Sequence, residues 1–178
     1  MFLVNEIKKE LRASMNGVLS ARMREAGMPY KLIFGVELPR LQSIADEFTP
    51  NKDLANLLWS ENIRECKLLA IMLMPPDEFT FELANIWKDG MVTAEEAQVL
   101  AMMLLSKTNQ AKEISLAWLG GNSSLPATCA CLCLRHLLMQ GINLNEREQI
   151  FAECERWLPK ANLHLRKAIQ ALTTALKE

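Results

Sequence analysis

Apolar residues recur every three or four positions along most of the chain, and this spacing predicts one α-helix after another. The first predicted helix runs over residues 3–25 and ends at Gly27, which suits a C-terminal cap. A short helix with Pro39 in its first turn follows and stops at Pro50, and Pro75-Pro76 is the clearest break in the chain. Outside one cysteine-rich run, no stretch alternates apolar and polar residues between turn signals, so no strand is predicted.

Four tryptophans organise the chain after this first part. Each ends a short predicted helix and precedes a break and a second apolar helix, at spacings of 28, 31 and 39 residues. These spacings are typical of stacked helical hairpins. The second helices share a small residue near their start, which lets neighbouring helices approach closely. The tryptophans are Trp59, Trp87, Trp118 and Trp157, and the small residues are Cys66, Ala97, Ala130 and Ala168.

This repetition predicts an all-α fold, a HEAT/armadillo-like right-handed solenoid of antiparallel helical hairpins. We expect a single domain over residues 1–178, with an N-terminal helix at 1–27 and HEAT-like repeats at 28–178. The alternative is a helical bundle without repeats, in which the tryptophan pattern arises by chance. Because the tryptophans recur at equivalent positions, we interpret them as packing anchors rather than base-stacking groups.

Charge is spread unevenly, although the net charge is only −1. Residues 1–40 carry seven Lys and Arg against four Asp and Glu, and residues 101–178 carry nine against six. Residues 41–100 carry four against eleven. The acidic middle is either a surface feature or a set of solvated helix faces. This balance does not demand nucleic acid as a partner, so charge alone leaves the function open.

Charged residues begin at Glu6, and the chain has no secretory signal core and no apolar run long enough to span a membrane. We therefore expect a soluble, cytoplasmic protein that has no membrane partner and keeps its five cysteines reduced. On a helix Cys129, Cys133 and His136 share one face, but they do not form a strong zinc motif. We interpret the run as a tightly packed inner helix, with a metal or redox site as the alternative.

Two segments carry a resemblance to a known family. The stretch KLIFGVELPRLQSIADEF at 31–48, followed by LLWSENIRECKLLAIMLM at 57–74, resembles the start of the DNA alkylation repair (AlkD-like) family of HEAT-like repeat DNA glycosylases. The segment HLRKAIQALTTAL at 164–176 looks like that family's last repeat. The resemblance implies a curved helical solenoid that holds duplex DNA on a basic concave face. It implies excision of cationic alkylated purines without a metal or an organic cofactor.

The family's catalytic residues are a Trp and an Asp at the start of one inner helix and an Arg on the next. A cationic base is attracted to an aromatic face, and a carboxylate stabilises positive charge on the sugar. Here residues 90–98 contain no Trp, and Glu95 is the candidate catalytic carboxylate. The neighbouring Glu96 is interpreted as half of a capping box with Thr93, whose N–H it would accept. The family's Arg is expected near Thr128, where this chain has none.

Four cations are the candidate DNA contacts. Arg64 and Arg166 occupy corresponding positions at the starts of their inner helices, and Lys67 and Lys167 lie beside them. Such residues neutralise phosphates when they face a groove, and they are ordinary solvated charges when they do not.

The sequence thus supports two classes of function. The first is a DNA alkylation repair-like protein that binds duplex DNA, with base excision weak or absent because the usual Trp and Arg are missing. The second is a non-enzymatic repeat scaffold that binds a protein or nucleic acid partner, because repeat folds host many functions.

Overall fold

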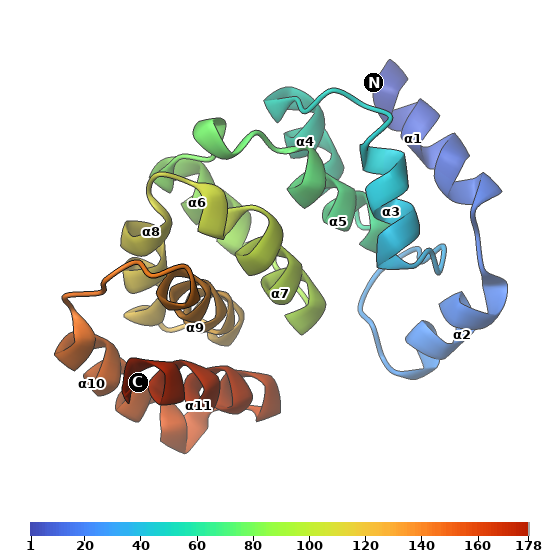
Figure 1. The fold of residues 1–178 in the computed structure, drawn as a ribbon. Helices are drawn as coiled ribbons and strands as arrows, with labels where there is room; N and C mark the ends of the chain where they lie inside the picture. Colours follow the sequence, from blue (N-terminus) through green and yellow to red (C-terminus); the bar gives the residue numbers. More distant parts are fainter. Residues whose placement is uncertain (178) are drawn as a thin grey trace. The chain divides into compact units, whose positions relative to one another are not determined.

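The computed structural model describes residues 1–177, and this part of the chain is entirely helical apart from turns and one isolated bridge (Figure 1). The all-α prediction is confirmed. The helices are α1 Phe2–Ala13, α2 Gly17–Glu25, α3 Leu38–Ala45, α4 Lys52–Trp59, α5 Arg64–Leu73, α6 Phe81–Lys88, α7 Ala94–Met103, α8 Ala111–Leu119, α9 Ser124–Met139, α10 Arg147–Trp157 and α11 Leu163–Lys177. Short 3-10 turns cover Pro76–Glu78, Leu105–Lys107 and Leu158–Lys160.

The chain folds as two compact units, Met1–Glu78 and a second one that begins at Phe79. The boundary follows Pro75-Pro76, the break that the sequence marks most clearly. In the first unit α3 and α4 pack on α5, and in the second α7, α8 and α11 pack on α9. The prediction of a single domain stays a prediction.

The predicted hairpins are present. Each tryptophan lies in the last turn of α4, α6, α8 or α10, and the second helices α5, α7, α9 and α11 follow. All four indoles are buried, and the small residues near the starts of the second helices are 0–3% exposed. The tryptophans are therefore packing anchors, as predicted.

In the second unit the indole N–H groups also join successive hairpins. Trp118 Nε1 donates to Asn85 Oδ1 at 3.3 Å, which links α8 to α6. Trp157 Nε1 donates to the Leu119 carbonyl at 2.8 Å, which links α10 to the end of α8. Trp118 and Trp157 thus each satisfy their indole N–H on the hairpin that precedes them.

The predicted first helix at 3–25 is wrong, because it breaks into α1 and α2. The buried face of α1 ends at Leu11. The Asn16 backbone N–H then donates to the Phe34 carbonyl at 3.0 Å, a long-range bond that local periodicity does not reveal. The Asn16 side chain caps the new helix by accepting from the Leu19 N–H. The predicted end of α2 is correct, since Gly27 adopts φ +83° just after it.

The cysteine run lies inside α9, as predicted. Cys129, Cys131 and Cys133 are 0% exposed, and all five cysteines of the chain are free thiols. Burial raises the pKa of the Cys133 thiol to about 11. Within residues 1–177 no group of three or more His, Cys, Asp or Glu could hold a metal ion. No helix in the same range is long and apolar enough to cross a membrane.

Candidate nucleic-acid interface

The two candidate cations of the first unit lie inside it. The Arg64 side chain is almost fully buried, and its Nη1 donates to Glu65 Oε1 and to the Val36 carbonyl, both at 2.9 Å. Lys67 is 7% exposed, and its Nζ lies 4.4 Å from the centroid of the Trp59 ring. Both cations have partners within the protein. Their role as phosphate contacts stays a prediction that this arrangement does not favour.

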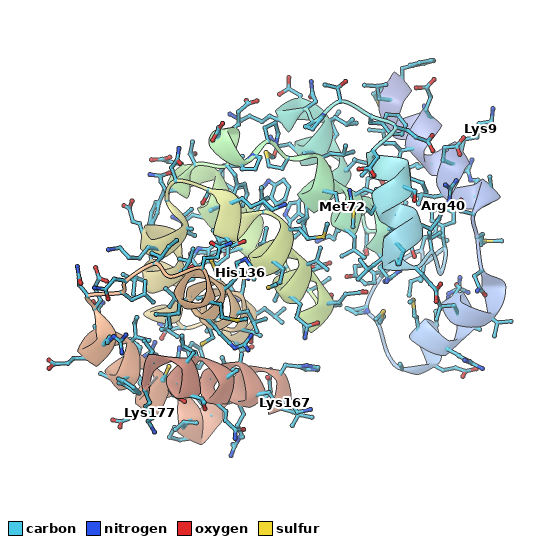
Figure 2. The ribbon with its side chains drawn as sticks, in the orientation of Figure 1. Lys9, Arg40, Met72, His136, Lys167 and Lys177 are labelled. Atoms are coloured by element: carbon cyan, nitrogen blue, oxygen red, sulfur yellow. The ribbon has the colours of Figure 1, made fainter. Side chains whose placement is uncertain are left out.

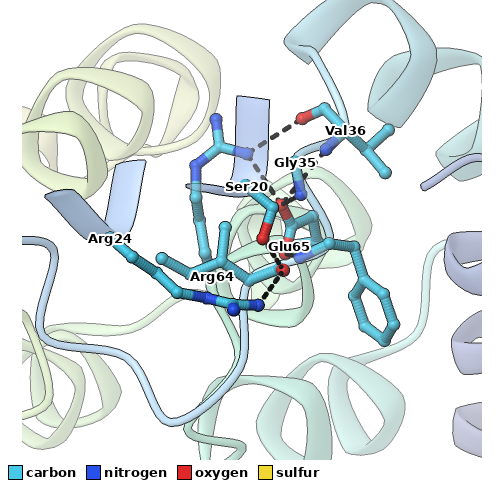
Figure 3. Close-up of polar contacts among 8 residues, drawn as sticks. Ser20, Arg24, Gly35, Val36, Arg64 and Glu65 are labelled. Atoms are coloured by element: carbon cyan, nitrogen blue, oxygen red, sulfur yellow. Dashed lines mark hydrogen bonds and ion pairs between the residues drawn. The ribbon is translucent and has the colours of Figure 1, made fainter. Parts of the chain in front are cut away.

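A buried carboxylate explains why Arg64 turns inward. Glu65 is 0% exposed, and its Oε1 accepts from the backbone N–H groups of Gly35 at 2.9 Å and Val36 at 3.3 Å. Its Oε2 accepts from the Phe34 N–H at 3.0 Å (Figure 3). The Phe-Gly-Val segment of the resemblance is therefore held by one glutamate about thirty residues later. Sequence reasoning missed this role, although a carboxylate in the apolar helix RECKLLAIML is an informative signal.

The two candidate cations of the second unit are exposed. Arg166 and Lys167 occupy the first part of α11, whose start is capped by the Asn162 side chain. Arg166 Nη2 lies 3.5 Å from the carbonyls of Leu158 and Ala161, which are weak contacts at a solvent-facing position. Lys167 and Lys177 lie toward opposite ends of the helix (Figure 2). Arg166 and Lys167 are thus available to an anionic ligand.

The candidate carboxylate Glu95 is half-buried in the first turn of α7. The Thr93 hydroxyl accepts from the Glu96 N–H at 3.3 Å, so Thr93 caps the helix as predicted. The Glu96 carboxylate, which is 0% exposed, accepts from the Val92 N–H at 2.7 Å. The capping role of Glu96 is confirmed. The Val92 N–H that donates to its carboxylate is one residue before the predicted Thr93 N–H.

A cleft of about 380 Å³ lies near this point. It is lined by the turn after α6, with Lys88, Asp89 and Met91, and by residues 123–126 at the start of α9. Asp89 is exposed and Lys88 is half-buried, so the cleft offers one carboxylate and one cation. Sequence reasoning did not select this cleft, because its two sides come from turns more than thirty residues apart.

The position expected for the family's Arg is closed. Thr128 is 1% exposed, and its hydroxyl donates to the Ser124 carbonyl one helical turn earlier, at 2.8 Å. Trp87, just before the cleft, is 1% exposed and packs edge-on against Phe79 at 5.2 Å between ring centroids. Neither side chain can contact a base or a phosphate in this arrangement.

Comparisons with known proteins agree with the resemblance seen in the sequence. A family model described as "DNA alkylation repair enzyme" matches residues 7–174. Among solved structures, the chain is similar to a protein described as belonging to a new family related to the HEAT-like repeat DNA glycosylases, with affinity for branched DNA structures. The TM-score is 0.83 at 17% identity, over 97% of this chain and 74% of that one. The fold is therefore HEAT-like, as predicted. A search of curated proteins found no match.

Proposed function

Because the chain belongs to the DNA alkylation repair enzyme family, we propose that it binds double-stranded DNA whose regular helix is disturbed by alkylation or by a branch. The observation that carries this proposal is the exposed pair Arg166 and Lys167 in the first part of α11, the second helix of the last hairpin. Adjacent cations of this kind neutralise backbone phosphates without reading sequence. The affinity of the structural neighbour for branched DNA supports the choice of a disturbed helix as the substrate.

We propose further that base excision by the family's usual route is weak or absent. Thr128 is buried where the family has its Arg, and residues 90–98 offer no Trp. An extrahelical base would enter the cleft beside α7, where Asp89 is the lining carboxylate and Glu95 lies in the adjoining first helical turn. Without the family's Arg to hold the phosphate, the sugar would be positioned less well beside the carboxylate, and poor positioning lowers the rate of cleavage. The proposed activity uses neither a metal nor an organic cofactor, and we propose that the protein acts in the cytoplasm.

Fluorescence anisotropy on labelled DNA tests the binding. The substrates are a continuous duplex, the same duplex carrying an abasic-site analogue, and a four-way junction, each over a salt series. We expect affinity to fall steeply with salt, and Arg166→Ala/Lys167→Ala to reduce the slope of log K against log salt by roughly 2, since each phosphate contact contributes about 0.9.

A matched control removes the same charge elsewhere in the second unit. Lys107→Ala/Lys177→Ala replaces two exposed lysines, one in the turn after α7 and one at the far end of α11. This variant should keep the parent's salt slope. If both double variants lose affinity equally, the interface is not at the start of α11. If the parent shows no binding at low salt, the DNA proposal fails and the scaffold class with a protein partner takes its place.

Excision is tested separately by release of 7-methylguanine from methylated duplex. We expect little or none from the purified protein. Robust release that is lost in Glu95→Gln would overturn the proposal of weak catalysis and would make Glu95 the catalytic carboxylate.

A further inference from the structure

The corner between α1 and α2 in the first unit presents two apolar side chains to solvent. Met15 is 59% exposed and Val18 is 67% exposed, although removing such apolar surface from water is favourable. They lie on either side of the cap residue Asn16, and Arg12 and Arg22 are exposed one helical turn before and after them. Single exposed apolar residues are common, but here two of them lie three residues apart in the sequence, between Arg12 and Arg22.

Hydrogen bonds hold this corner against the 33–36 loop. The Asn16 N–H donates to the Phe34 carbonyl at 3.0 Å, and the Ser20 hydroxyl donates to the Ile33 carbonyl at 2.7 Å (Figure 3 includes Ser20). Gly35 adopts φ +76°, and a Cβ built there would lie 2.3 Å from the backbone carbonyl oxygen of Asn16. The two backbones therefore touch at a point where only glycine fits. Ser20 is the only buried residue of α2, so these polar contacts define the position of the helix.

The support behind the corner is the buried glutamate described above. Glu65 accepts the N–H groups of Phe34 and Gly35, whose neighbouring backbone atoms in turn hold the corner. A series of hydrogen bonds thus runs from α5 through the 33–36 loop to Asn16 and Ser20, in the segment that carries Met15 and Val18. An element fixed in this way pays little ordering entropy on contact with a ligand, which is the condition for a preorganised binding surface.

The charge around the corner favours an anionic ligand. Arg12, Arg22 and Arg24 are exposed, and with Glu10 and Glu25 at the two ends of this segment residues 10–25 carry a net charge of +1. Apolar side chains flanked by arginines match DNA whose base steps can be opened, because the wedge replaces stacking while the guanidinium groups hold the flanking phosphates.

We propose that the α1–α2 corner is a second DNA contact, in which Met15 and Val18 enter an opened base step and Arg12 and Arg22 bind the adjacent phosphates. This inference rests on the proposed DNA-binding function and adds to it the residues that would recognise a branched or unstacked helix. The contact is independent of Arg166 and Lys167, which belong to the other compact unit.

The test uses a four-way junction that carries 2-aminopurine beside the branch point, since this base brightens when it leaves the stack. The parent protein should increase the fluorescence on binding. Met15→Ala/Val18→Ala should reduce that increase at least about fivefold, while affinity for a continuous duplex changes less than about twofold, because unstacking is needed only at the wedge. Arg12→Ala/Arg22→Ala should weaken binding to both substrates and lower the salt slope by roughly 2.

The matched control is Ile86→Ala/Met139→Ala, which truncates two apolar side chains of similar exposure, 69% and 66%, in the second unit. It should behave like the parent. If the parent binds DNA but Met15→Ala/Val18→Ala gives the parent's fluorescence, the wedge is refuted and the proposed function stands. If the parent binds no DNA, both proposals fall. Alanine is a good helix former at exposed positions, so circular dichroism should confirm that every variant is folded.

Discussion

Replacing Glu65 with glutamine should destabilise the first unit strongly. The carboxylate is 0% exposed and accepts three backbone N–H groups and the Arg64 guanidinium. An amide oxygen can replace Oε1, but the amide nitrogen would face the Phe34 N–H, donor against donor. Arg64, which is almost fully buried, would also lose the charged carboxylate that its Nη1 contacts at 2.9 Å. Removing one partner of a buried pair costs about 3–5 kcal/mol, so we expect a loss of that size in the free energy of unfolding.

Urea unfolding followed by circular dichroism and a thermal scan measure this loss. For a chain of this length it should lower the melting temperature by roughly 10 °C. The control is Glu61→Gln, the same substitution at a half-exposed carboxylate that pairs with Lys8 on the surface. Such a pair contributes only about 0–1 kcal/mol. An unfolding free energy of Glu65→Gln within about 1 kcal/mol of the parent would refute the assignment of Glu65 as the support of the loop.

Two further predictions concern the tight glycine and the thiols. Gly35→Ala should destabilise the protein by more than about 1 kcal/mol in urea unfolding, because φ is +76° and a Cβ would clash with backbone, whereas Gly17→Ala, with open space and ordinary φ, should be neutral or stabilising. In iodoacetamide labelling followed by mass spectrometry across pH 7–9, Cys154 should be the first of the buried thiols to react, because it lines a cavity beside α11 and the hydrogen bond from Cys131 lowers the pKa of its thiol. Cys66 should stay unlabelled until the protein unfolds, because burial raises the pKa of its thiol to about 12; earlier labelling of Cys66 would contradict this order.

The repeat architecture was predictable because it depends on features that recur along the chain. Trp59, Trp87, Trp118 and Trp157 end the first helices of four hairpins, and each is followed by a helix with a buried small residue. This periodicity depends on the spacing of residues along the chain, so it can be recognised in a single sequence. The burial of the cysteine run followed from the same reasoning, since a free thiol among Leu and Ala residues behaves as a small apolar group.

The features that were not predictable depend on bonds between distant segments. The break at Asn16 is set by the Phe34 carbonyl, and the inward turn of Arg64 is set by Glu65 together with the loop that Glu65 holds. A cation at the start of an amphipathic helix looks solvent-exposed unless its buried partner is known. Arg166 contacts the backbone carbonyls of Leu158 and Ala161 at 3.5 Å and is exposed as expected.

The indole bonds of the second unit have a consequence for cooperativity. Since Trp118 donates to α6 and Trp157 donates to the end of α8, each hairpin completes the hydrogen bonding of an anchor that belongs to the next one. Opening an earlier hairpin therefore leaves a buried donor unsatisfied in its successor, whereas α10 and α11 can open without this penalty to α6–α9. Local unfolding in this unit should start from the C-terminal hairpin and spread backward, as in a one-dimensional array with coupling between nearest neighbours.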